Sequence, residues 1–136
     1  MAEGLFRRAV TGREKEFVIG SAGVAAVDGY PSTLETIRAM SEAGIDISGH
    51  KSRRLTRELA ESADKIYVME KLHREMIVNF WPHLRERVHL LTEFLPEAEQ
   101  KNLTVDIPDP IHLSDDFYRR VLKMVDDCIK KIAETI

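Results

Sequence analysis

Helical segments alternate along this chain with short apolar runs, and this alternation is the strongest constraint on its fold. The runs are FVI at residues 17–19, KIYVM at 65–69 and RVHLL at 87–91, and stretches with helical periodicity lie between them. Short apolar runs bounded by turn residues are typical of strands that are buried on both faces. The alternation therefore predicts a parallel sheet covered by helices on both sides, in a single domain over residues 1–136.

The first ten residues, MAEGLFRRAV, have the pattern of an amphipathic helix with Leu5, Phe6, Ala9 and Val10 on one face. Ser, Thr, Asp or Asn commonly caps a helix start, yet Met1 leads directly into this run. The sequence also has fewer apolar runs than a typical sheet has strands, which is about five to six. Both observations lead us to expect that a strand and a loop of the fold precede Met1.

A second helix is predicted from a capping box at residues 32–35, Ser-Thr-Leu-Glu. Leu34, Ile37 and Met40 follow along one face of this helix. Gly44 is placed to end it in a left-handed turn, because glycine adopts that conformation without a steric penalty. We therefore expect this helix to end just before Gly44.

Two further helices follow the second apolar run. The first carries Leu72, Met76 and Phe80 at every fourth position and stops before Pro82, which cannot continue a helix. The second begins at Ser114 as its N-cap and continues nearly to the end of the chain. Both have the length and periodicity of helices that pack against a sheet.

Composition excludes several functional classes. The chain has 136 residues, of which 43% are hydrophobic and 32% charged, and a net charge of -3. This charge argues against a nucleic-acid or membrane-surface partner, because phosphate groups attract clusters of Lys and Arg. No apolar stretch approaches the roughly 20 residues that span a bilayer. We expect a soluble, cytoplasmic protein.

The sequence contains one cysteine, Cys128. It excludes an internal disulfide and makes a thiolate metal cluster implausible, so we expect no metal and no other cofactor. Cys128 shares a helical stripe with Phe117, Val121 and Val125, which places it on the core-facing side of the last helix. Reactive thiols need accessible, electropositive surroundings, so we interpret Cys128 as an inert core residue.

Four segments together resemble the low-molecular-weight protein phosphatases: MAEGLFRR at residues 1–8, FVIGSAG at 17–23, GIDISGHKSRRLT at 44–56 and DIPDP at 106–110. They occur in the family's order and cover essentially the whole chain. The resemblance implies a flavodoxin-like three-layer α/β fold with a short parallel sheet. It also implies hydrolysis of phosphotyrosine or phosphoarginine in a protein substrate through a cysteinyl-phosphate.

In that family, a central strand and a Cys-x5-Arg-Ser loop with the nucleophile come just before the MAEG-like residues. This sequence contains neither. We therefore expect the first central strand of the sheet to be missing and the chain as given to be inactive. A sheet that lacks a central strand exposes unpaired backbone groups, which also predicts self-association.

Asp109 is the candidate general acid. Pro108 and Pro110 stiffen the backbone on either side of it, and it lies in a long connection that extends from about Leu91 to Ser114. From the residues alone, an Asp-Pro turn with an Asx cap is the simpler explanation. The resemblance implies the acid role, because the family's general acid is the Asp of an Asp-Pro dipeptide at this place. Other acids, Asp106 among them, fit turn and helix-start preferences better.

Ser21, His50 and Tyr30 are further candidates. Ser21 directly follows an apolar run, where a parallel sheet places its binding crevice, and His50 follows Gly49 in a polar loop. The resemblance implies that Ser21 and His50 support the phosphate loop through hydrogen bonds and that Tyr30 forms part of the substrate wall. Ordinary turn hydrogen bonds and loop packing explain all three equally well.

The residues after Asp-Pro leave the substrate open. Family members that act on phosphotyrosine often have aromatic residues there, whereas Ile111 and His112 follow in this chain. Phosphoarginine phosphatases share several of the segments, but usually continue with different residues. A noncatalytic pseudophosphatase that acts as a binding module is the alternative from another class. A small flavodoxin-like ligand-binding or receiver domain is a third, although no acidic pair follows the first apolar run.

Overall fold

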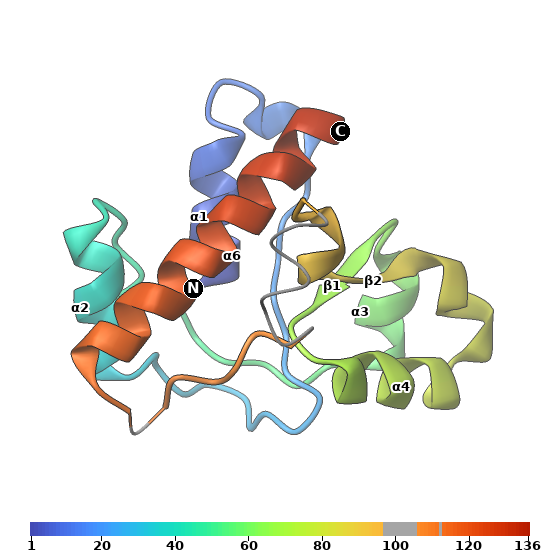
Figure 1. Ribbon diagram of the computed structural model, residues 1–136. Coiled ribbons are helices and arrows are strands. Elements are labelled where there is room, and N and C mark those ends of the chain that lie inside the picture. Colours follow the sequence, from blue (N-terminus) through green and yellow to red (C-terminus); the bar gives the residue numbers. More distant parts are fainter. Residues whose placement is uncertain (97–105, 112) are drawn as a thin grey trace.

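The computed structural model describes residues 1–96, 106–111 and 113–136, and helices make up most of it (Figure 1). The α-helices are α1 (Ala2–Ala9), α2 (Leu34–Glu42), α3 (Arg57–Ser62), α4 (Lys71–Phe80) and α6 (Asp115–Thr135). The short 3₁₀ helices are η1 (Glu14–Glu16), η2 (Pro82–Arg87) and η3 (Leu91–Phe94). The strands are β1 (Ile66–Val68) and β2 (Val88–Leu90).

The two strands pair in parallel, with Ile66 opposite Val88 and Val68 opposite Leu90. Successive side chains of a strand point to opposite faces of its sheet. One face therefore carries Ile66, Val68, Val88 and Leu90 into a core with α3, α4 and η2, and the other face presents Tyr67 and Met69 to the helices on the opposite side. The predicted parallel pairing of the second and third apolar runs is confirmed.

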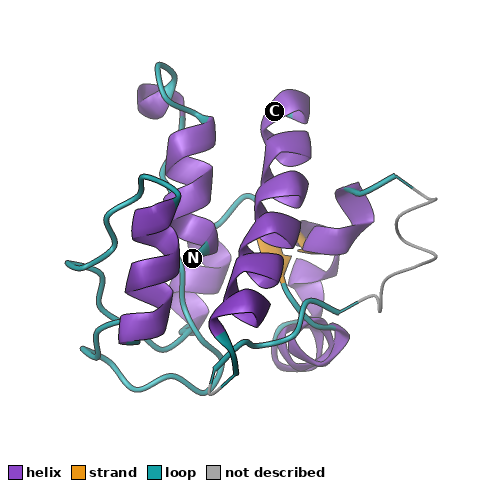
Figure 2. Cartoon of the chain, turned by 60° about the vertical axis from the view of Figure 1, so that its left-hand side comes forward, coloured by secondary structure: helices purple, strands orange, loops and turns teal. Residues whose placement is uncertain are grey.

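The sheet separates two helical layers (Figure 1). α3 and α4 lie on one side of it, and α1, α6 and η3 lie on the other. The strands are very short compared with the helices around them (Figure 2). This arrangement is the three-layer, flavodoxin-like α/β fold that the sequence predicts. Within the described residues, no helix combines the length and apolar character needed to cross a membrane.

α6 contributes more buried residues than any other element to the larger of the two hydrophobic cores, the one that also includes Leu5 of α1. It begins at Ser114, whose Oγ accepts a hydrogen bond from the Phe117 N–H at 3.2 Å, as the sequence predicts. Its apolar stripe packs on α1, and an ion pair of 2.9 Å between Arg8 and Asp126 joins the two helices. Cys128 lies on this stripe with no exposed surface. The prediction of a core cysteine is therefore confirmed.

α2 begins one residue later than predicted. Thr33, not Ser32, is the N-cap, and its Oγ1 accepts from the Thr36 N–H at 3.3 Å. Gly44 ends the helix with a positive φ of 78°, and its N–H donates to the Ser41 carbonyl at 2.9 Å. A Schellman motif of this kind satisfies the last carbonyls of the helix, as the predicted glycine end requires.

The buried face of α4 differs from the predicted one. Leu72 and Phe80 are 58% and 69% exposed, whereas Ile77 is 2% exposed. A spacing of four residues is compatible with more than one helical face, and here Ile77 and Val78 occupy the side that meets the sheet and η2. The helix does end at Phe80, before Pro82, as expected.

The first apolar run, residues 17–19, does not form a strand. Phe17 has extended backbone angles of -130° and 139°, yet Val18 is fully exposed and no ladder forms along the run. Arginine side chains bind carbonyl groups in this run and just after it: Arg7 Nη2 donates to the Ile19 carbonyl at 2.6 Å and Arg53 Nε to the Ser21 carbonyl at 2.8 Å. Predicting a buried strand here was wrong, because an extended run becomes a strand only beside a partner.

Candidate functional site

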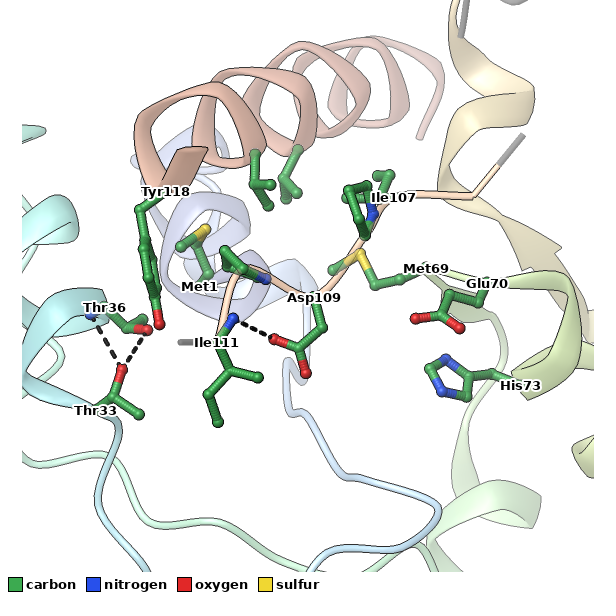
Figure 3. A pocket seen from close by; sticks show the side chains of 14 residues that line it. Met1, Thr33, Thr36, Met69, Glu70, His73, Ile107, Asp109, Ile111 and Tyr118 are labelled. Atoms are coloured by element: carbon green, nitrogen blue, oxygen red, sulfur yellow. Dashed lines mark hydrogen bonds between the residues drawn. The ribbon is translucent and has the colours of Figure 1, made fainter. Parts of the chain in front are cut away.

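A pocket of about 340 Å³ opens where the chain leaves β1 (Figure 3). Met69 and Glu70, which follow the strand, form one side of it with His73 from α4. The segment around Asp109 crosses it, and side chains of α6 form its apolar floor. Crevices beyond the carboxyl ends of parallel strands are the usual binding places of open α/β sheets. The remaining lining residues are Met1, Thr33, Thr36, Ile107, Pro108, Pro110, Ile111, Tyr118, Val121 and Val125.

Asp109 lies at this pocket with an exposed carboxyl group. One of its oxygens, Oδ1, accepts a hydrogen bond from the Ile111 N–H at 3.0 Å, which forms an Asx turn (Figure 3). The Asx cap considered from the sequence is thus present. This turn uses only one of the two carboxyl oxygens. The second oxygen makes none of the hydrogen bonds found for the described residues, so it can still contact a ligand.

The segment that carries Asp109 is anchored to the sheet at its start. The Ile107 N–H donates to the Met69 carbonyl at 2.9 Å, and Asp106 Oδ1 accepts from the Lys71 N–H at 2.8 Å. Asp106 thereby satisfies a free amide at the beginning of α4, which fits the predicted helix-start role of this residue. These two hydrogen bonds fix the backbone three residues before the carboxyl group of Asp109.

Ser21 and His50, far apart in sequence, meet at Glu3. Ser21 Oγ donates to Glu3 Oε2 at 2.6 Å, and His50 Nδ1 lies 3.8 Å from the same oxygen. Arg7 completes the cluster with two contacts to Glu3 Oε1, at 3.0 and 3.2 Å. Glu3 is in the first turn of α1, two residues after Met1, which lines the pocket. Ser21 and His50 therefore support the start of α1.

Glu3, which joins Ser21 to His50, is a residue that the sequence analysis did not single out. A single Glu in a first helical turn is explained by the helix dipole, so no pattern singled it out. Burial of its carboxyl group acts to raise the pKa, but hydrogen bonds from Ser21 and Arg7 outweigh this and hold the pKa of Glu3 below its ordinary value. The side chain is accordingly a carboxylate, which can bind both Ser21 and His50.

Tyr30 is placed apart from the pocket lining. The residue is 63% exposed, while its backbone N–H donates to Ser52 Oγ at 3.0 Å and its carbonyl accepts from the Ser52 N–H at 2.7 Å. Its predicted role in a substrate wall stays a prediction. His112 and residues 97–105 of the long connection lie outside the described residues, and η3 forms the first turn of that connection.

No described part of the chain gathers three His, Cys, Asp or Glu side chains in a position to hold a metal ion. The described residues bring several side chains and backbone amides to the pocket or near it. These comprise a carboxyl group on a stiffened turn, the beginning of α1 and a supporting carboxylate cluster.

Comparison with known proteins identifies the family. The sequence matches the family described as low molecular weight phosphotyrosine protein phosphatase over residues 1–136. It is 28% identical to the protein-arginine-phosphatase of Bacillus subtilis (strain 168) over 136 residues, which cover all of this chain and 87% of that protein. It is also 28% identical to the low molecular weight protein-tyrosine-phosphatase Etp of Escherichia coli (strain K12), over 100% of this chain and 84% of that one.

The fold agrees with these sequence relationships. The structure of a cysteine-to-serine mutant of the YwlE arginine phosphatase, with a phosphorylated active-site serine, has a TM-score of 0.86 and 28% sequence identity to this chain. The match covers 98% of this chain and 84% of that one. The chain therefore belongs to the low molecular weight phosphotyrosine protein phosphatase family.

Proposed function

We propose that residues 1–136 form the body of a protein phosphatase that hydrolyses phosphotyrosine or phosphoarginine through a cysteinyl-phosphate. The observation that carries this proposal is the carboxyl group of Asp109, held by an Asx turn at a pocket beyond β1. Breaking a phosphate ester or phosphoramidate by a thiolate requires an acid that protonates the leaving group. The proposal assigns this step to Asp109, and its place in the pocket lining supports the assignment.

The beginning of α1 supplies the second part of the proposed site. The first amides of a helix have no acceptor within it and carry a partial positive charge, so they favour a phosphate group. Met1, at the N-cap of α1, lines the same pocket as Asp109. In this proposal the cluster of Glu3, Ser21 and His50 keeps the start of α1 rigid, so that phosphate binding costs little reorganisation.

The nucleophile is proposed to lie outside these 136 residues. The sequence holds no Cys-x5-Arg motif, and its cysteine, Cys128, has no exposed surface. The YwlE structure, in which the serine that replaces an active-site cysteine is phosphorylated, supports a cysteinyl-phosphate in this family. The chain as given is accordingly proposed to be inactive and to require a nucleophile-bearing segment for turnover.

A noncatalytic binding module is the second candidate, and the same missing motif favours it. We also propose that the chain self-associates, because Phe17 is extended, Val18 is fully exposed and the run at residues 17–19 has no strand partner among the described residues. An extended apolar edge of this kind readily pairs with another chain. Sedimentation at increasing protein concentration tests this, and a strictly monomeric chain over the whole range contradicts it.

Activity assays separate the candidates. The 136-residue chain should hydrolyse neither an aryl phosphate nor phosphoarginine above background, and Cys128→Ser should change nothing. Turnover that Cys128→Ser abolishes would overturn the proposal.

In a form that also contains a Cys-x5-Arg segment, Asp109→Ala should lower kcat by about 10²- to 10⁴-fold, the usual contribution of a general acid. Asp116→Ala, at an exposed acid in the first turn of α6, is the matched control. A complete form that still binds phosphorylated peptides without turnover would establish the binding module.

A further inference from the structure

Tyr118 of α6 is a buried residue whose polar end faces the pocket. It is only 2% exposed and lines the pocket, as does Val121 on the next turn of the helix. Figure 3 shows its side chain extending from α6 into the pocket, with the hydroxyl group toward the side where Thr33 and Thr36 lie. The ring is thus part of the pocket wall, and the hydroxyl group points into the space that a ligand would occupy.

The Tyr118 hydroxyl group makes none of the hydrogen bonds found among the described residues. The backbone N–H of Tyr118 donates to the Ser114 carbonyl at 3.1 Å, as the helix requires. The nearby hydroxyls bind each other, with Thr33 Oγ1 2.9 Å from Thr36 Oγ1 and 3.3 Å from the Thr36 amide nitrogen. In the part of the chain that the structure describes, no fully buried side-chain oxygen lacks a partner, so the Tyr118 oxygen is open to solvent.

An unpaired hydroxyl on a buried ring needs an explanation. Buried tyrosine hydroxyls ordinarily have a hydrogen-bond partner, because a polar group without one costs free energy. A phenylalanine ring would fill the same space at this position without that cost. The Tyr118 hydroxyl therefore has an unused capacity to donate and accept, and the pocket gives a bound molecule access to it.

The rest of the pocket indicates which kind of group fits this hydroxyl. Figure 3 shows Glu70 on the far side of the pocket from Tyr118, with Asp109 between them. Carboxylates repel an anion, and a cation gains more from a carboxylate than from a hydroxyl. Val121 and Val125 of the same helix add aliphatic surface beside Tyr118. A neutral acceptor attached to aliphatic carbon suits these surroundings, and an amide carbonyl is such an acceptor.

We propose that the pocket contains an amide-binding subsite, in which the Tyr118 hydroxyl donates a hydrogen bond to a carbonyl group of the protein substrate. This inference rests on the proposed function, which supplies a polypeptide as the ligand. Every residue of a polypeptide carries a backbone carbonyl, and Asn and Gln side chains carry the same group. Tyr118 is thus a substrate-binding residue that holds an amide next to the phosphorylated side chain.

Binding to the 136-residue chain tests this inference without turnover. The probes are 4-methylpentanamide, 4-methylpentanoate and 4-methylpentylammonium, which share one carbon skeleton and differ in charge. Each is titrated while backbone amide signals are followed by NMR. We expect the neutral amide to bind most tightly and to shift the signals of residues 33–36 and 117–121 in a saturable way.

Tyr118→Phe removes only the hydroxyl group. It should weaken binding of the neutral amide about 2- to 12-fold, the range for a hydrogen bond between neutral groups. The same change should leave Tm as it is, because among the described residues the hydroxyl has no hydrogen bond to lose. Tyr67→Phe is the matched control, since Tyr67 of β1 loses the same group outside the pocket lining and should keep the wild-type affinity.

Several results would overturn the inference. Equal or tighter binding of the carboxylate would show an anion site, and equal or tighter binding of the ammonium ion would show attraction by the acids alone. An unchanged affinity in Tyr118→Phe, an equal loss in Tyr67→Phe or the absence of saturable binding contradicts it as well. A lowered Tm in Tyr118→Phe would show that the hydroxyl has a structural partner, which also excludes the proposed role.

Failure of the proposed function has a different signature. A complete form without any turnover leaves the affinities of the 136-residue chain for these probes as they are. In an active form, Tyr118→Phe should lower kcat/KM for a phosphorylated peptide about 2- to 12-fold more than for a simple aryl phosphate, which has no amide group. Equal losses for the two substrates would contradict an amide-binding role while the phosphatase activity itself stands.

Discussion

Strand β1 (Ile66–Val68) and residues 17–19 are apolar runs of similar make-up in different surroundings. β1 pairs with β2 and has helical layers on both faces, so that Val68 is 7% exposed. Residues 17–19 begin with an extended Phe17 but lack a strand partner among the described residues, and Val18 is fully exposed. Whether an apolar run forms a strand therefore depends on the segments next to it as much as on its own residues. The comparison can be tested by applying the same change to both runs.

The largest expected effect comes from placing a charge in each run. Val68→Asp puts a carboxylate into the core beside Ile77 and Leu84, which should lower the free energy of unfolding by about 3–5 kcal/mol or prevent folding. Val18→Asp, at a fully exposed position, should change it by less than about 0.5 kcal/mol. Urea denaturation of both variants measures this. Similar losses would mean that residues 17–19 are buried in solution.

Hydrogen exchange sharpens the comparison without mutation. The amides of β1 that pair with β2 should exchange at least about 10²-fold more slowly than those of residues 17–19, because opening the sheet requires both cores to open. Exchange followed by NMR gives the values residue by residue. Strong protection across residues 17–19 in a monomeric sample would show that this run finds a partner after all.

Arg53 provides a smaller test, since it binds the backbone next to the unpaired run. Arg53→Ala removes the hydrogen bond to the Ser21 carbonyl and should cost about 1 kcal/mol. Arg54→Ala is the matched control, because the hydrogen bond found for Arg54 among the described residues comes from its backbone N–H, which donates to Asp28 Oδ1 at 2.7 Å. Thermal denaturation compares the two, and equal shifts in Tm would contradict a specific role for Arg53.

The smallest effect concerns pH. The pKa of Glu3 is lower in the folded protein than its ordinary value, so the stability that its carboxylate contributes is present above that ordinary value. This contribution is lost as the pH falls through the folded pKa. Unfolding free energies measured from about pH 6 to pH 3 should converge for wild type and Glu3→Gln, with a difference at pH 6 on the order of 0.5 kcal/mol. A difference that grows toward low pH would reverse the assigned sign.

The sequence predicted those helix ends that depend on residues close together along the chain. The Ser114 cap, the glycine turn at Gly44 and the stop before Pro82 all depend on residues a few positions apart, and the structure contains each of them. The sequence could not predict which face of α4 is buried, because its apolar residues lie on more than one face of the helix. The packing of the sheet and η2 against α4 decides which face is buried.

The sequence predicted those candidate site residues that belong to a recognisable motif. Asp109 was found through its two flanking prolines, and Ser21 and His50 through their segments. The residue that joins Ser21 to His50, Glu3, lies 18 positions from Ser21 and 47 from His50 and has no signal of its own.

The two hydrogen bonds that hold residues 106 and 107 have an evolutionary consequence. They tie the start of the segment that carries Asp109 to Met69 and Lys71, so the position of Asp109 depends on the junction between β1 and α4 and on the Asx turn to the Ile111 N–H. Side-chain substitutions after Pro110 leave these backbone hydrogen bonds in place. The outer part of the segment can therefore vary in sequence while Asp109, the proposed acid, keeps its position.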